Sequence, residues 1–159
     1  MRFRIISVGK IREPFYDQGI KEYLKRLKPY TNIELLDGLE EKTNPQAGLA
    51  EIAKCRQKEG RKIMDLMGRD EIAVVFDIQG EMLSSAKWAN YIEQLNGRSS
   101  SRINMIIGGA FGLDERVKQR AERKISFSPM TFPHQMAVLM LTEQIYRSFK
   151  IIRREPYHK

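Results

Sequence analysis

Both histidines of this 159-residue chain lie in its last 44 residues, together with nearly all of its excess positive charge. His134 and His158 are 24 residues apart, and Tyr157 directly precedes His158. Residues 116–159 hold ten basic and three acidic side chains, a net charge of +7, whereas residues 1–115 carry a net charge of +1. Histidine takes up and releases protons near neutral pH, so it is a common proton-transfer group in enzymes. Such groups within a basic segment point to chemistry on a polyanion.

Four basic residues near the end of the chain follow one another at helical spacing: Arg147, Lys150, Arg153 and Arg154. The net charge of +8 and the pI of about 9.7 favour an acidic partner, with nucleic acid first and an anionic membrane second. A solvated helix face, or a basic protein without such a partner, would explain these numbers as well. Because the charge is concentrated in one segment, we expect nucleic acid.

Other reactive patterns are missing from the sequence. Cys55 is the only cysteine, which excludes an internal disulfide and a cysteine metal cluster. The two histidines lack the spacing of a zinc motif, and neither G-x-S-x-G nor a Walker A loop occurs, so we expect no metal. The N-terminus is too short and too charged for a signal peptide, and no apolar run approaches the roughly 18 residues of a membrane span. We therefore expect a cytoplasmic protein without a membrane partner.

The elements that must position the reactive residues alternate between strands and helices. We predict strands at 3–8, 33–36, 72–78, 103–107 and 124–127, and helices at 14–27, 49–67, 84–95, 114–122 and 133–152. The apolar runs at 72–78 and 103–107 are typical of strands buried on both faces of a parallel sheet. This order predicts a single α/β domain over residues 1–159, with a mainly parallel sheet flanked by helices.

Single residues are expected to begin, interrupt or end these elements. Gly60 should interrupt the second predicted helix, and Gly80 should turn the chain after the third predicted strand. Ser84 or Ser85, and Asp114, should each cap a helix, because their side chains accept hydrogen bonds from the first free backbone N–H groups.

The last predicted helix is apolar without a break over residues 136–141. A helix that is hydrophobic nearly all round must be covered on several sides. Its own sheet can cover one side, and a second copy of the protein can cover another. A central core helix in a monomer is the alternative, but a chain of 159 residues with one sheet favours a homodimer.

Three segments should meet beyond the carboxyl ends of the strands, where open α/β sheets bind ligands: 76–80, 108–113 and 127–132. Glycines in the first two allow the backbone to approach a ligand closely. Residues 127–134 are nearly uncharged and contain two prolines, which suits a neutral adenine ring and a thioether. Turns that only connect a strand to a helix would have the same local composition.

Six short motifs occur in order along the chain: VGK at 8–10, DIQG at 77–80, IIGG at 106–109, MTFPH at 130–134, EQIYR at 143–147 and PYHK at 156–159. Gly-Gly loops alone are common, but this ordered combination is specific. Over essentially its whole length the chain resembles the RlmH-type 23S rRNA pseudouridine N3-methyltransferases, which belong to the SPOUT (α/β-knot) class.

The resemblance implies S-adenosylmethionine as the methyl donor, a deep trefoil knot near the C-terminus, and a homodimer with its active site at the subunit interface. The family's substrate is a pseudouridine of large-subunit ribosomal RNA in the assembled ribosome. Carried over by motif, the cofactor-binding residues are Phe76, Gly108, Phe127, Ser128, Pro129, Met130, Thr131 and Phe132. The catalytic and RNA-binding residues are Arg147, Tyr157 and His158, with the partner subunit as one source of them.

One position departs from the family pattern. An arginine usually lies four residues after the histidine of the TFPH segment, and this chain has Val138 there. An ion pair or RNA contact made by that arginine is therefore in doubt.

The implied reaction requires a base, because N3 of pseudouridine must lose its proton near the moment of attack. His158 is the leading candidate, since an unperturbed histidine has a pKa of about 6.5. Tyr157 would orient this base or stack on the substrate ring. Two other functions fit parts of the pattern. A non-catalytic ribosome-binding or assembly factor could keep the same fold, and a flavin or nucleotide oxidoreductase fits the strand–helix order but lacks a phosphate loop.

Overall fold

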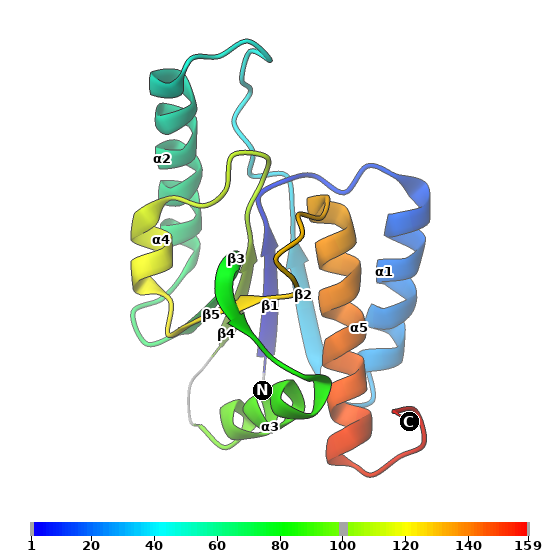
Figure 1. The fold of residues 1–159 in the computed structure, drawn as a ribbon. Helices are drawn as coiled ribbons and strands as arrows, with labels where there is room; N and C mark the ends of the chain where they lie inside the picture. The colour runs from blue at the N-terminus through cyan, green and yellow to red at the C-terminus, as the bar shows by residue number, and fades with distance from the viewer. Residues whose placement is uncertain (1, 99–101, 159) are drawn as a thin grey trace.

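Strands and helices alternate strictly along the chain in a computed structural model, which describes residues 2–98 and 102–158. Figure 1 shows the elements in order: β1 (Arg2–Ser7), α1 (Pro14–Leu27), β2 (Asn32–Leu36), α2 (Leu49–Leu66), β3 (Ile72–Met82), α3 (Ser85–Asn96), β4 (Ile103–Ile107), α4 (Glu115–Arg120), β5 (Arg123–Ser126) and α5 (His134–Ile152). All ten predicted elements are present, with ends that differ by a few residues.

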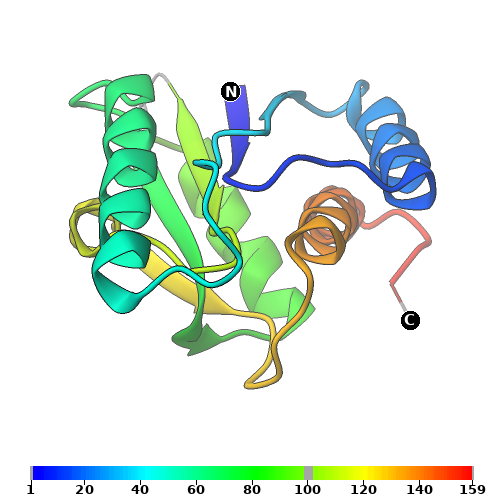
Figure 2. The ribbon, with the colours of Figure 1, turned by 90° about the horizontal axis from the view of Figure 1, so that it is seen from above.

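The five strands form one sheet in the order β2-β1-β4-β3-β5, and every neighbouring pair is parallel. Parallel strands need crossover connections, which here are the helices. Seen from above, the sheet lies between α2 and α4 on one side and α1 and α5 on the other (Figure 2). The predicted α/β architecture with a parallel sheet is confirmed. The trefoil knot stays a prediction.

Each face of the sheet has its own hydrophobic core. The larger core lies under α1, α3 and α5 and contains Phe3, Val74 and Met105. The smaller core lies under α2 and α4 and contains Ile6, Val75 and other residues of alternate strand positions. All five residues of β4 are buried, as expected of a strand covered on both faces.

The predicted break at Gly60 is wrong, because α2 runs without interruption from Leu49 to Leu66. A Cβ atom on Gly60 would lie 2.4 Å from Cβ of Asp114, so the glycine lets the start of α4 pack closely on α2. The two predicted caps are confirmed. Asp114 accepts a hydrogen bond from the Arg116 backbone N–H at 2.9 Å, and Ser84 accepts one from the Lys87 N–H at 3.2 Å.

The predicted turn at Gly80 is also wrong, because β3 continues to Met82. Its pairing with β5 shifts register, so that Phe76 and Glu81 both pair with Ile125. The residues between them bulge out of the strand. A Cβ atom on Gly80 would lie 2.5–2.8 Å from backbone atoms of Ile125, so glycine is needed where the chain returns to β5.

Helix α5 is covered within its own chain more fully than the sequence suggests. It packs against α1 and α3 as well as the sheet, and Val138 and Leu141 are fully buried. Met136, Leu139 and Met140 remain partly exposed. The homodimer therefore stays a prediction. No helix in the described ranges is long and apolar enough to cross a membrane.

Candidate functional site

The three segments expected at the carboxyl ends of the strands surround one cavity of about 460 Å³. This volume is within the range of small-molecule sites. Seven of the eight predicted cofactor residues line it: Phe76, Gly108, Phe127, Ser128, Met130, Thr131 and Phe132. The eighth, Pro129, lies in the same loop but does not line the cavity. Asp77, Ile78 and His134 also line it; they lie in the segments expected near a ligand but were not among the residues predicted to bind the cofactor.

Backbone geometry shapes the wall that follows β4. The Gly112 N–H donates to the Gly109 carbonyl at 3.1 Å, which closes a tight turn. Gly112 has a φ of 75°, a conformation that favours glycine. The turn keeps the backbone of Gly108 at the cavity wall without a side chain to fill it.

The opposite wall is a short loop that is bonded to itself. The Ser126 hydroxyl donates to the Ser128 carbonyl at 2.9 Å, and the Ser128 hydroxyl accepts from the Met130 N–H at 3.1 Å. The ring of Phe127 stacks on Phe76 with centroids 4.9 Å apart. These contacts tie the loop to β3, so the cavity is formed before any ligand arrives.

Among the described lining residues two side chains are titratable, those of Asp77 and His134, and both already form hydrogen bonds. Asp77 pairs with Lys118 at 2.6 Å and accepts the Gln79 N–H at 2.9 Å. Burial would raise the pKa of Asp77, but these two interactions outweigh it and hold the pKa below its ordinary value. His134 Nε2 lies 2.9 Å from the Lys10 carbonyl, which can only accept, so Nε2 carries the hydrogen.

The chemistry of the cavity follows from this lining. Among the described residues that line it there is no lysine or arginine, so a phosphate group would find no cation there. Aromatic and apolar walls with nearby backbone groups suit a neutral ring and a thioether. The residues present therefore fit an adenosyl group carrying a sulfur atom.

A second hollow of about 500 Å³, the α5 groove, lies between α3 and α5 and has no counterpart in the predictions. It shares five lining residues with the cavity, namely Phe76, Ile125, Ser126, Phe127 and Phe132. Glu143 and Gln144 contribute polar atoms on the α5 side. Helical periodicity identifies the apolar side of each helix but not which helices face each other, so the groove could not be predicted.

The three predicted catalytic residues lie together at the far end of α5. The Arg147 guanidinium is 4.7 Å above the Tyr157 ring, and its Nη1 is 3.3 Å from His158 Nδ1. A guanidinium can only donate, so Nδ1 accepts and the hydrogen of the neutral ring is on Nε2. The lone pair that would take a proton therefore faces Arg147.

Arg147, Tyr157 and His158, together with Glu143 and Tyr23, form what we call the tail cluster. Glu143 accepts hydrogen bonds from Arg147 and, at 3.1 Å, from the Tyr157 hydroxyl. The Tyr23 hydroxyl is 3.4 Å from that of Tyr157. Burial, the contact with Tyr23 and the charge of Glu143 together raise the pKa of Tyr157, so its phenol stays protonated. The Glu143–Arg147 spacing of four was a visible sequence signal, whereas Tyr23 gave none.

The cavity and the tail cluster are separated along α5. His134 lines the cavity at the start of the helix, and Arg147 follows it by thirteen residues, roughly 20 Å along the axis. In Figure 1 the loop before α5 and the C-terminus lie at opposite ends of this helix. No described residue from 139 onward lines the cavity, so within one chain residues 139–158 do not reach it.

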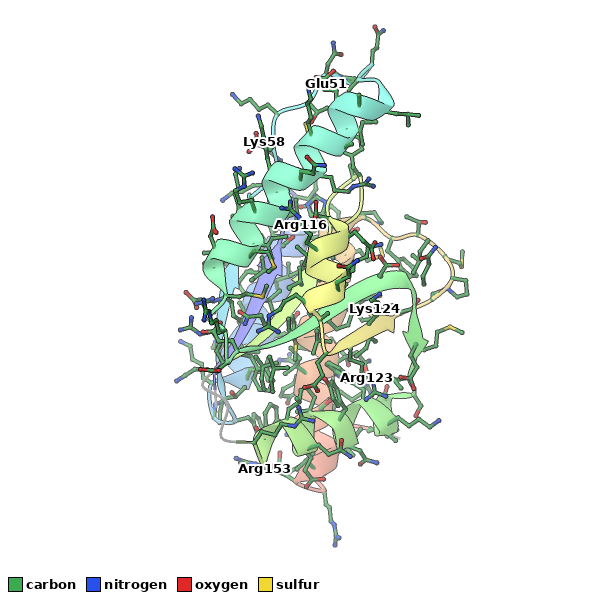
Figure 3. The ribbon with its side chains drawn as sticks, turned by 90° about the vertical axis from the view of Figure 1, so that its left-hand side faces the viewer. Glu51, Lys58, Arg116, Arg123, Lys124 and Arg153 are labelled. Carbon is green, nitrogen blue, oxygen red and sulfur yellow. The ribbon has the colours of Figure 1, made fainter. Side chains whose placement is uncertain are left out.

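The basic residues of the last 44 positions do not form one surface. Arg116 lies on α4 and Arg123 and Lys124 lie on β5, whereas Arg153 follows the end of α5, which lies behind these elements in the view of Figure 3. Arg116 pairs with Asp114, and Arg123 with Glu81. The expectation that charge and proton-transfer groups coincide therefore holds in sequence but only in part in space.

Several tail cations also have partners. Lys150 pairs with Glu155 at 2.6 Å, and Arg153 lies 4.6 Å above the Tyr30 ring. Arg154 is exposed and has a φ of 54°. The position that departs from the family pattern, Val138, is fully buried in the larger core, so no ion pair or RNA contact can arise from it.

Over its whole length the chain is similar to known and predicted methyltransferases. Residues 1–158 match the family described as "Predicted SPOUT methyltransferase". Proteins named ribosomal RNA large subunit methyltransferase H from Syntrophomonas wolfei and Halothermothrix orenii are 55% and 43% identical over 159 residues. The protein of that name from Enterococcus faecalis is 41% identical. Each comparison covers 100% of both chains.

Proposed function

Because the chain belongs to the SPOUT methyltransferase family, we propose that it transfers a methyl group from S-adenosylmethionine to a pseudouridine of large-subunit (23S) ribosomal RNA. The acceptor is N3 of the ring, and the substrate is the assembled ribosome. The proposal places the activity in the cytoplasm, where ribosomes are.

The observation that carries this proposal is the cavity at the carboxyl ends of β3, β4 and β5. Its aromatic walls, and the absence of lysine and arginine among its described lining residues, favour an adenosyl thioether over a nucleotide phosphate. Phe76, Gly108 and the run 127–132 would hold the cofactor, which supplies the methyl group. The stacked rings of Phe76 and Phe127 would keep water from the reacting atoms.

The tail cluster would manage the proton and charge of the substrate ring. His158 is the proposed base, and a positioned base contributes roughly 10²–10⁴-fold to a rate. Its Nδ1 faces Arg147, so the ring must turn away from this arginine before it accepts the N3 proton. Arg147 can then stabilise the negative charge of the deprotonated ring. Tyr157 stays protonated and can only orient or stack, not act as the base.

A homodimer would bring the two regions together. If two α5 helices pack antiparallel about a twofold axis, the tail of one subunit lies beside the cavity of the other. Exposed apolar side chains near the cavity support such an interface, since Met130, Met82 and Ile78 are 71%, 62% and 57% exposed. The α5 groove lies between the two regions and would be covered by the partner.

The test is transfer of labelled methyl from S-adenosylmethionine to ribosomes of a strain that lacks this protein, with the modified nucleotide mapped. We expect label at N3 of one pseudouridine of the large subunit. Label elsewhere would contradict the substrate. Calorimetric binding of the cofactor without any transfer would favour a ribosome-binding factor that has kept the fold.

A further inference from the structure

Glu143 joins the C-terminal tail to α5 through a single carboxylate. Its Oε1 accepts from both Arg147 and the Tyr157 hydroxyl, and its Oε2 accepts from Gln144 Nε2 at 2.8 Å. The Glu143 side chain is only 17% exposed and lines the α5 groove. Three donors therefore converge on one anion where the tail meets the helix.

We propose that Glu143 is a positioning residue, which docks the tail on α5 and fixes the direction in which His158 is presented. This inference rests on the proposed function, in which His158 acts on the substrate. Glu143 orients Arg147, and Arg147 in turn donates to His158 Nδ1. The carboxylate thus sets the position of the proposed base through one intermediate residue.

The tail needs such an anchor because it is not helical. Helix α5 ends at Ile152, and Tyr157 then folds back so that its ring lies 4.9 Å from Tyr146, edge to face. The hydroxyl of Tyr157 contacts Glu143 and Tyr23, and its ring lies under the Arg147 guanidinium. Loss of the carboxylate would leave Arg147 without its counter-ion and the Tyr157 hydroxyl with only the longer contact to Tyr23.

A second glutamate–arginine pair shows what helix stabilisation alone would look like. Glu22 and Arg26 on α1 have the same spacing of four residues, but their side chains are 49% and 45% exposed. Such exposed pairs contribute little to stability. Glu143 differs because it is mostly buried and bonds to a segment beyond its own helix.

The experiment compares Glu143→Gln with the matched control Glu22→Gln. Glutamine keeps the size of the side chain and removes its charge. We expect the single-turnover methyl-transfer rate at saturating cofactor to fall roughly 10- to 100-fold in Glu143→Gln, because small misplacements of a reacting group cost that much. Cofactor affinity should stay at the wild-type value, and the melting temperature should fall only slightly, because Arg147 loses a mostly buried partner. Glu22→Gln should change none of the three.

A spectroscopic readout separates positioning from a merely structural role. The chain has two histidines, so NMR gives two sets of ring signals. In Glu143→Gln we expect the His158 signals to shift and the His134 signals to stay. Tyr157→Phe, which removes one donor to Glu143, should shift the His158 signals less.

A wild-type rate and unchanged His158 signals in Glu143→Gln would overturn the inference, as would equal shifts in Glu22→Gln. A wild-type protein that transfers no methyl group to ribosomes would instead overturn the proposed function. The His158 signals would still decide whether Glu143 docks the tail.

Discussion

The cavity and the tail cluster are built from different kinds of interaction. The cavity is formed by strand ends, glycine turns and stacked rings that are continuous with the hydrophobic core. The tail cluster is formed by side-chain hydrogen bonds at the end of one helix. Cofactor binding should therefore depend on the fold as a whole, whereas catalysis should depend on a few replaceable side chains.

The largest expected effect is at His158, where a substitution should lower the methyl-transfer rate without changing cofactor affinity. His158→Ala should lower the single-turnover rate roughly 10²–10⁴-fold, because it removes the proposed base. Calorimetry should find cofactor affinity unchanged, since His158 does not line the cavity. A variant that turns over at the wild-type rate would remove His158 from the mechanism.

A substitution in β3 beside the cavity should instead weaken both the fold and cofactor binding. Gly80→Ala places a Cβ against the Ile125 backbone and should destabilise the fold by about 2–3 kcal/mol, as overpacking does. Because Ile125 leads into the loop at 127–132, cofactor affinity should fall as well. Gly97→Ala is the control, since its Cβ would meet only ordinary contact at 3.5 Å. Equal melting temperatures for the two variants would contradict the close approach of β3 to β5.

The one carboxylate among the described cavity-lining residues should matter for stability and its pH dependence. Asp77→Asn should cost about 1 kcal/mol at pH 7, because Lys118 then loses a mostly buried partner. The pKa of Asp77 is lowered in the folded protein, so its contribution is present above the unfolded value of about 3.9 and is lost as pH falls through the folded value.

Denaturant unfolding at several pH values tests this expectation. The gap between wild type and Asp77→Asn should close in acid, and the exposed variant Asp65→Asn should show no such gap. A gap that widens as pH falls would mean that Asp77 is not stabilised by Lys118.

The smallest expected effect concerns RNA binding beyond α5. Replacing Arg153 and Arg154 by alanine should shallow the dependence of log affinity on log salt by about 0.7–0.9 for each RNA phosphate that these arginines neutralise. Lys54→Ala with Arg61→Ala on α2 is the control on the other layer of the molecule. An unchanged slope in the first pair would show that neither arginine touches the backbone of the ribosomal RNA.

Local patterns were sufficient to predict the fold. Apolar runs such as 103–107 identify buried strands, and helical spacing identifies the helices between them. The meeting of three loops also followed, because parallel strands end at the same edge of a sheet. Seven of the eight residues predicted for the cofactor consequently line one cavity, although their role stays a prediction.

Individual side-chain contacts between distant segments could not be predicted. The predictions for Gly60 and Gly80 were wrong because each glycine makes room for a residue far away in sequence. Gly60 lies against Asp114, and Gly80 lies against Ile125. The contact between Tyr23 and Tyr157 spans 134 positions and follows no periodicity. The excess charge of the last 44 residues is divided between α4–β5 and the end of α5 for the same reason (Figure 3).

Subunit complementation tests most directly whether the tail of one subunit completes the cavity of the other. Gly108→Trp should fill the cavity and His158→Ala should disable the tail, so each variant alone should be inactive. If the two regions act across the interface, equal amounts of the variants should recover about a quarter of wild-type activity after subunit exchange, because half of the dimers then hold one intact site of two. Activity no higher than that of the separate variants would contradict the account.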